Sequence, residues 1–239
     1  MGNSCDMKCK ILTLCMVVIT FWACKESTPD IGHYEYVQSN YVERPFSIDD
    51  TTTVVFSGGN MYVNQKLDTC FFDFFEHQYD YWASDYDLLL QDSVIRDTTT
   101  GKHFWGRLLT EKEWNYLLYQ RPNAICLRGQ AIVNTIHGYI LLPDDWSLPI
   151  GLTFVCMTNN WTTNIYSATQ WQLMESHGAV FFPCAGHREK GKTYYPEQFG
   201  YYWVADSASF IFIGSDFADV HHNAYKTVAM SVRPARRAP

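Results

Sequence analysis

Charged residues are scarce in this 239-residue sequence, and basic residues do not predominate. Only 18% of the residues are charged, and 25 acidic side chains outnumber 18 basic ones, which gives a formal net charge of −7. A nucleic-acid-binding surface needs clustered lysine and arginine to neutralise phosphates, so this composition argues against one. The hydrophobic fraction of 47% is too high for a disordered chain and is enough for a large core. We therefore expect a folded protein that binds no nucleic acid.

The apolar run near the N terminus is too short to span a membrane. It extends from Ile11 to Ala23, whereas a spanning helix needs about 20 residues. Lys8 and Lys10 precede the run, which is the pattern of a secretory signal peptide. Ala23 followed by Cys24 resembles a bacterial lipobox, in which the peptide is cut before the cysteine and a lipid is attached to it. The alternatives are an ordinary secretory signal or a short N-terminal anchor.

These features divide the chain into three parts. We expect a signal peptide at residues 1–23, a tether lipidated at Cys24 over residues 24–50, and a folded domain over residues 51–239. The tether is polar, contains Pro29 and Pro45, and has no helical period. Residues 25–27 (Lys-Glu-Ser) resemble the charged segment that sends some lipoproteins to the outer face of the outer membrane. The expected location is the cell surface, on the outer membrane.

Cysteine motifs for metal binding are absent. The sequence has no CxxC pair and no Cys/His cluster of the kind that binds zinc. Beyond Cys24, the cysteines are Cys70, Cys126, Cys156 and Cys184. In an exported protein these allow three disulfide pairings, among which the sequence does not choose. Buried unpaired thiols are the alternative.

The first of two helices has a clear start and stop. Thr110 and Glu113 have the spacing of a capping box, in which each side chain binds the backbone N–H of the other residue. Leu109 and Trp114 occupy the hydrophobic staple positions on either side of the cap. Pro122 ends the pattern. We expect a helix that begins after Thr110 and ends before Pro122.

The second helix repeats the same signals. Ser167 and Gln170 form the box, and Tyr166 and Trp171 form the staple. Gly178 suits the position just after the helix, where a left-handed backbone is common. The glutamates of the two helices are better explained as caps and solvated faces than as acid–base groups.

Short apolar runs separated by turn residues predict strands around these helices. An irregular mixture of strands with only two helices favours an α+β fold over a βαβ repeat. Two long stretches, residues 66–104 and 185–200, show no regular period, and such connections are functional or irregular but packed. The expected strands are Thr52 to Phe56, Gly138 to Leu142, Ala179 to Phe182, Tyr201 to Ala205, Ser209 to Ile213 and Thr227 to Val232.

The segment from Arg107 to Trp114 resembles the R-L-P-T-E-x-E-W segment of formylglycine-generating-enzyme-like domains, which have a C-type-lectin fold. More closely, the chain resembles surface lipoproteins of gut-type Gram-negative bacteria related to the Fib_succ_major paralogous family. The resemblance covers most of the chain after the tether. The matching pieces, in order, are Val55 to Asn60, Thr110 to Arg121, Leu127 to Ala131, His137 to Trp146, Met174 to Pro183, Gly200 to Trp203 and Ser231 to Arg233.

The resemblance implies a C-type-lectin-like domain, in which two helices flank a twisted antiparallel sheet and the C-terminal strands carry ligand-facing loops. In some relatives the matching C-terminal stretch is the variable region of a diversity-generating retroelement. Here that stretch is Val204 to Met230, and a stiff scaffold suits display of its polar and aromatic residues. The alternative is an ordinary hairpin with exposed polar residues. The candidate ligand-binding residues are Asp206, Ser207, Asp216, Asp219, His221, His222, Asn223 and Tyr225.

The sequence lacks the catalytic residues of the formylglycine-generating oxidases and a recognisable metal site. No cysteine follows Cys184, so the late cysteine pair of the formylglycine-generating oxidases has no counterpart. Adjacent His221 and His222 face opposite ways on a strand, which argues against a shared metal. We expect no catalysis, metal or cofactor, and a partner that is an extracellular protein or glycan. An adhesin or pilus-tip component and an oxidase are the alternatives.

Overall fold

The computed structural model describes residues 42–66, 69–74, 76–80, 94–96, 103–206, 209–215, 218–222 and 228–239. The chain divides into two compact units, Met1–Val37 and Gln38–Pro239, and every described residue belongs to the second. The predicted signal peptide and the lipidation site Cys24 lie outside the described residues. No helix in the described ranges has the length and apolar character needed to cross a membrane.

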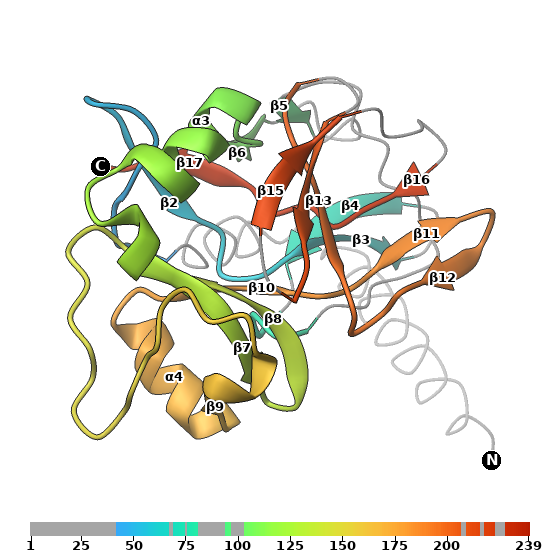
Figure 1. Ribbon diagram of the computed structural model, residues 1–239. Helices are drawn as coiled ribbons and strands as arrows, with labels where there is room; N and C mark the ends of the chain where they lie inside the picture. Colours follow the sequence, from blue (N-terminus) through green and yellow to red (C-terminus); the bar gives the residue numbers. More distant parts are fainter. Residues whose placement is uncertain are drawn as a thin grey trace, which may run out of the picture. The chain divides into compact units, whose positions relative to one another are not determined.

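Both predicted helices are present, with the predicted caps (Figure 1). Helix α3 (Glu111–Asn115) continues as a π-helical turn, η1 (Tyr116–Gln120). Thr110 Oγ1 accepts from the N–H of Glu113 at 3.3 Å, and the Glu113 carboxylate accepts from the N–H of Thr110 at 2.8 Å. These two bonds satisfy N–H groups that the first turn of a helix leaves free.

Helix α4 (Ala168–Ser176) begins with the same arrangement. The Ser167 hydroxyl accepts from the N–H of Gln170 at 3.2 Å, and the Gln170 side chain accepts from the N–H of Ser167 at 2.9 Å. The staple rings of Tyr166 and Trp171 have centroids 6.3 Å apart. Gly178 follows the helix with φ of +98°, as the sequence predicts.

The strands form several small sheets, all antiparallel except for the pair β7–β9. The described residues therefore have a mixed α+β fold that is mostly strand. The largest sheet has the order β1-β2-β17-β6-β5, with β1 Phe46–Ser47, β2 Thr53–Phe56, β17 Ala235–Arg237, β6 His103–Arg107 and β5 Val94–Arg96. The next has the order β10-β8-β7-β9, with β10 Val180–Pro183, β8 Ile136–Leu141, β7 Arg128–Val133 and β9 Ile165–Tyr166.

Three smaller sheets complete the described fold. The hairpin β3 (Met61–Lys66) and β4 (Thr69–Phe74) stands as a pair. One three-stranded sheet has the order β12-β11-β16, with β12 Lys192–Tyr194, β11 His187–Glu189 and β16 Val228–Ala229. The other has the order β13-β14-β15, with β13 Gly200–Trp203, β14 Phe210–Ile213 and β15 Ala218–His221.

Residues 42–50, expected in the tether, belong to the fold. Phe46 and Ile48 are fully buried, and β1 pairs with β2. Asp144 accepts from the backbone N–H of Ser47 at 2.7 Å and pairs with Arg121 at 2.8 Å. The packed domain therefore begins before residue 51, because two apolar side chains of this mostly polar segment are buried in the core.

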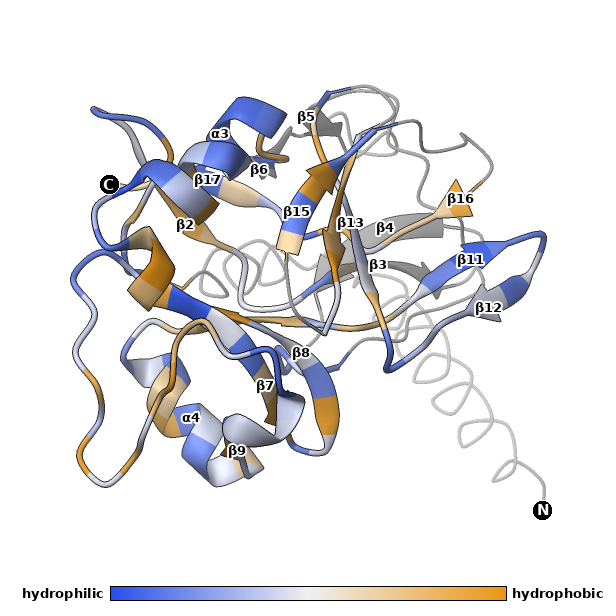
Figure 2. Cartoon of the chain, in the orientation of Figure 1, coloured by the Kyte–Doolittle hydropathy of each residue, from blue (hydrophilic) through white to orange (hydrophobic). Residues whose placement is uncertain are grey.

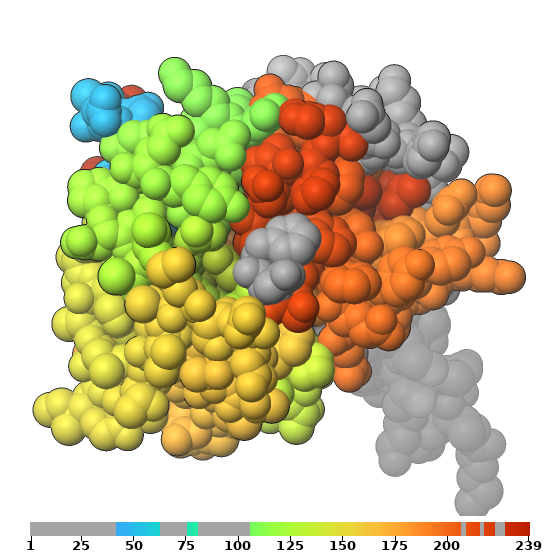
Figure 3. Space-filling model, in the orientation of Figure 1, coloured from blue at the N-terminus to red at the C-terminus, as the bar shows by residue number. Residues whose placement is uncertain are grey.

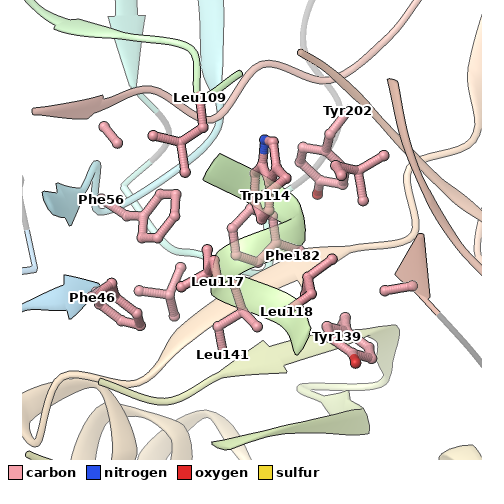
Figure 4. Close-up of a cluster of buried hydrophobic side chains, with 14 of the residues drawn as sticks. Phe46, Phe56, Leu109, Trp114, Leu117, Leu118, Tyr139, Leu141, Phe182 and Tyr202 are labelled. Atoms are coloured by element: carbon pink, nitrogen blue, oxygen red, sulfur yellow. The ribbon is translucent and has the colours of Figure 1, made fainter. Parts of the chain in front are cut away.

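The main core lies between helix α3 and the strands β2, β10 and β13 (Figure 4). Its aromatic rings pack mainly edge to face: the Phe182 centroid is 5.6 Å from Phe56, 5.7 Å from Trp114 and 5.2 Å from Tyr202. Figure 2 shows hydrophobic residues along β2 and β10, which cross this core. A second cluster, around Trp171 and Phe181, lies under helix α4.

A buried arginine connects the core to the last strand. The Arg233 side chain donates to Asn60 Oδ1, to the carbonyl oxygen of Ser57 and to that of Phe181, at 3.0, 3.0 and 2.6 Å. Tyr202 donates its hydroxyl to the carbonyl oxygen of Pro183 at 2.8 Å. Arg233, Asn60 and Tyr202 all lie in the segments that carry the family resemblance. They have structural roles, since their hydrogen bonds satisfy buried polar groups.

Candidate functional site

The sheet β13–β14–β15 has one face in the core and one face outward. Tyr202, Ile211 and Ile213 point inward, and each has an exposed fraction of 2% or less. Tyr201 and Phe212 are register partners on the opposite face and are partly exposed. Along β14, Phe210 and Phe212 are partly exposed, whereas Ile211 and Ile213 are buried.

The outward rings contact one another across the three strands. The Tyr201 centroid lies 5.8 Å from Phe210 and 5.2 Å from Phe212. His221, on β15, lies 5.7 Å from Phe210 and 5.4 Å from Phe212. The sheet therefore presents adjacent aromatic rings on its outer side.

The hairpin β11–β12 and the turn after it extend these rings. His187 lies 4.7 Å from Tyr201 and 5.3 Å from Tyr194, centroid to centroid. Tyr195 and Phe199 are 5.5 Å apart, and Phe199 is 5.2 Å from Phe212. We call this contiguous surface the aromatic face: His187, Tyr194, Tyr195, Phe199, Tyr201, Phe210, Phe212 and His221.

Two tyrosines give the aromatic face its most accessible rings. Tyr194 and Tyr195 have exposed fractions of 39% and 48%. In the space-filling view the C-terminal third of the chain, in orange and red, forms a continuous part of the visible surface (Figure 3). Residues of β11 to β15 contribute to the orange and red surface in this view.

The electrostatics of the aromatic face favour neutral groups. Burial lowers the pKa of His187 below its ordinary value of 6.5, although Glu189 opposes the shift. The imidazole is therefore neutral at physiological pH. Burial also raises the pKa of Tyr201, with a further contribution from Tyr195, so this phenol stays protonated. The rings can offer flat stacking surfaces and neutral hydrogen-bonding groups.

Two of the predicted ligand-binding residues lie at the aromatic face. His221 is one of its rings. Asp219 is exposed and pairs in register with Phe212, so its carboxylate stands beside that ring. Asp219 Oδ1 also accepts from the N–H of Val220 at 2.8 Å.

Two others lie apart from that face, at the start of helix α3. Asp206 accepts from the N–H of Glu111 at 2.6 Å. His222 Nδ1 is 3.1 Å from the Ser209 hydroxyl, and its Nε2 is 3.4 Å from a carboxylate oxygen of Glu111. These contacts tie the C-terminal segment to the helix. The remaining predicted residues, Ser207, Asp216, Asn223 and Tyr225, lie outside the described residues.

Glu113, Glu175 and Cys184, which could be taken for reactive groups, have structural roles. Glu113 closes the capping box and pairs with Arg107 at 2.6 Å. Glu175 accepts from the side chain of Gln78 at 2.8 Å. Cys184 is fully buried, and burial raises the pKa of its thiol. Within the ranges that the structure describes, no three His, Cys, Asp or Glu residues cluster in a way that could hold a metal ion.

Sequence reasoning missed most of the aromatic face. Tyr194 and Tyr195 fall in the stretch without regular period, where the strands β11 and β12 are short and polar. A usable signal existed in β13, where aromatic side chains occupy both alternating sets of positions, and in β14, where phenylalanines fill one set and isoleucines the other.

No protein-family model matches the chain, and no curated protein or solved structure matches it.

Proposed function

We propose that this protein is a non-catalytic surface lipoprotein that binds an extracellular protein or glycan through the aromatic face. In this proposal Cys24 carries the lipid that anchors the chain to the outer membrane, and the domain is C-type-lectin-like. The leader pattern and the lipobox-like Ala23-Cys24 support the anchor. Two capped helices beside antiparallel sheets support the fold.

One observation carries the binding proposal: the outward side of the sheet β13–β14–β15 is aromatic. An antiparallel sheet that packs one face on a core ordinarily presents polar residues on the other. Tyr201, Phe210 and Phe212 occupy those positions instead. Grouped surface aromatics rimmed by polar residues mark interaction sites.

The chemistry of this surface suits a ligand with flat apolar patches and hydroxyl or amide groups. Rigid rings supply contact area at a low cost in conformational entropy. The exposed Asp219, which pairs in register with Phe212, supplies a polar contact, and Tyr194 and Tyr195 supply exposed rings with hydroxyl groups. Pyranose faces and aliphatic or aromatic protein side chains both meet this description.

Binding is tested with the purified full chain on a glycan array and in a screen against extracellular proteins. Tyr194→Ala and Tyr195→Ala change exposed rings, so both variants should fold. Each should weaken binding about tenfold, which corresponds to about 1.4 kcal/mol. Leu173→Ala is the matched control, because Leu173 is 41% exposed on helix α4, away from the aromatic face.

Unchanged affinity in Tyr194→Ala, Tyr195→Ala and His221→Ala together would place the binding surface elsewhere. The adhesin or pilus-tip alternative predicts instead that the chain is recovered in high-mass polymers. Size-exclusion chromatography of the exported chain separates the two, since a ligand-binding lipoprotein runs without such polymers.

The anchor is tested separately with Cys24→Ser. In a Gram-negative host the unchanged chain should incorporate a labelled fatty acid and fractionate with the outer membrane. The variant should lose the label. Equal labelling of both chains would refute lipidation at Cys24.

A further inference from the structure

Cys126 and Cys156 are far apart in sequence but lie on adjoining segments. Cys126 belongs to the 3-10 helix η2 (Ala124–Leu127), which leads into β7. Cys156 lies in the long connection between β8 and β9, the yellow loop in Figure 1. The first segment is fixed by the N–H of Cys126, which donates to the carbonyl oxygen of Asn123 at 2.8 Å.

Backbone contacts hold the second segment alongside the first. The N–H of Met157 donates to the carbonyl oxygen of Arg128 at 3.4 Å. A Cβ built on Gly129 would lie only 3.2 Å from the carbonyl oxygen of Val155. Residues 155–157 therefore run next to residues 128–129, and Cys156 is placed opposite the start of β7.

A buried asparagine fixes this alignment. Asn164 accepts from the N–H of Val155 at 2.9 Å and donates to its carbonyl oxygen at 2.8 Å. The same amide donates to the carbonyl oxygen of Gln130 at 2.9 Å. The Asn164 side chain thus binds the loop through both Oδ1 and Nδ2, and it binds β7 through Nδ2.

The two thiols meet at the surface. The Cys126 and Cys156 side chains are within hydrogen-bonding reach, and burial together with the neighbouring Cys126 thiol raises the pKa of Cys156. Cys126 is exposed and Cys156 is partly exposed, so a reagent in solution can reach the pair. Cys184 has no such access, because it is fully buried.

We propose that Cys126 and Cys156 form a disulfide in the exported protein. The two thiols would lose two protons and two electrons as the S–S bond forms. A disulfide-bearing oxidant, either an oxidoreductase of the export compartment or oxidised glutathione, is reduced to its two thiols in the same exchange. The bond depends on the oxidising compartment that the proposed export supplies, and not on ligand binding.

The bond would fasten the loop between β8 and β9 to η2, just before β7. That loop contains Ile150, which is 99% exposed, and Met157, which is 69% exposed. Only η3 (Trp161–Thr163) gives it regular structure between residues 142 and 164. A cross-link at Cys156 adds a covalent restraint to the hydrogen bonds and the apolar contacts that hold the loop.

The test equilibrates the purified full-length chain in a glutathione buffer rich in the oxidised form, followed by alkylation and peptide mapping. We expect the Cys126 and Cys156 peptides to appear as one species that separates on reduction, with Cys184 alkylated only after unfolding. The thermal midpoint of the oxidised chain should exceed that of the reduced chain by about 5–10 °C.

Two variants separate this bond from other oxidation products. Cys156→Ser should lose both the linked peptide and the difference in thermal midpoint, whereas Cys184→Ser should retain both. The proposal is overturned if Cys126 and Cys156 remain free thiols at equilibrium, or if Cys126 is found joined to glutathione or to Cys70 instead. Because the assay is done in a defined buffer, a failure of export or of ligand binding does not affect its result.

Discussion

Arg233 and Asn60, which are 173 residues apart, share a buried hydrogen bond of 3.0 Å between Nε and Oδ1. Two backbone carbonyl oxygens accept the other donors of the guanidinium. Burial lowers the pKa of Arg233 to about 10, so the side chain stays charged at neutral pH. The Arg233 guanidinium, whose hydrogen bonds go to carbonyl oxygens, thus links the C-terminal segment to the residues after β2.

Replacing Arg233 with methionine should destabilise the domain strongly. The change removes the donor to Asn60 Oδ1 and a donor to each of two buried carbonyl oxygens, and an unsatisfied buried group costs about 1–3 kcal/mol. We expect the free energy of unfolding in urea to fall by about 3 kcal/mol or more. Arg237→Ala, which changes an exposed arginine at the end of β17, should shift the free energy of unfolding by less than about 1 kcal/mol. Similar losses in both variants would contradict the role of Arg233.

Asp206 should matter for stability rather than for binding. Its carboxylate accepts from the first N–H of helix α3 at 2.6 Å, a group that the helix itself cannot satisfy. Asp206→Ala should cost about 1 kcal/mol and lower the thermal midpoint by about 2–4 °C. Its affinity for any ligand of the aromatic face should be unchanged. If the variant has native stability but no longer binds ligand, Asp206 is a ligand-binding residue and the prediction is wrong.

Gly186 holds the hairpin β11–β12 close to its neighbours. Its φ is +68°, and a Cβ at this position would lie 2.1 Å from the carbonyl oxygen of Tyr194. Gly186→Ala should therefore cost more than about 2 kcal/mol in unfolding experiments, through backbone strain and overlap. Gly191→Ala is the control: its φ is +75° but no atom lies within 4 Å, so a cost of about 1 kcal/mol is expected.

Glu113 should contribute a measurable pH dependence. Burial raises the pKa of Glu113, but hydrogen bonds from Arg107 and Thr110 lower it by a larger amount. The pKa of Glu113 therefore lies below its ordinary value of 4.5. A carboxyl group with a lowered folded-state pKa stabilises the fold above the unfolded-state pKa. That stability is lost as the pH falls through the folded-state pKa.

The free energy of unfolding should therefore decline below about pH 4.5, in urea titrations at a series of pH values. Glu113→Gln should be less stable than the parent chain at pH 7, and the difference should shrink as the pH falls. Glu43→Gln, at an exposed residue, is the control and should leave the pH profile unchanged. A constant difference at all pH values would exclude ionisation of Glu113 as the cause.

Local signals made the helices predictable. The residues that cap each helix and fill its staple positions lie within one six-residue segment, for example Tyr166 to Trp171. Each interaction depends on the chain next to it and needs no tertiary information. The strands with buried faces, such as β8 and β10, were predictable for a similar reason, since their residues are mostly apolar.

Tertiary contacts decided what the sequence could not show. The strands β11 and β12 contain mostly polar residues, and their hairpin depends on Gly186 and on pairing with β16. In β14 both sets of alternating side chains are apolar, so the pattern cannot tell inside from outside. The orientation of Phe210 and Phe212, and hence the aromatic face, is set by which side of the sheet meets the core.

The position of strand β17 has a consequence for biosynthesis. It lies between β2 and β6 in the largest sheet, with Ala235 paired to both Phe56 and Arg107. The sheet therefore cannot close until the ribosome has added residues 235–237, and pairing over such long separations is slow. A chain released before that point would expose the unpaired edges of β2 and β6, which can template aggregation. We therefore expect a chain truncated before residue 235 to aggregate.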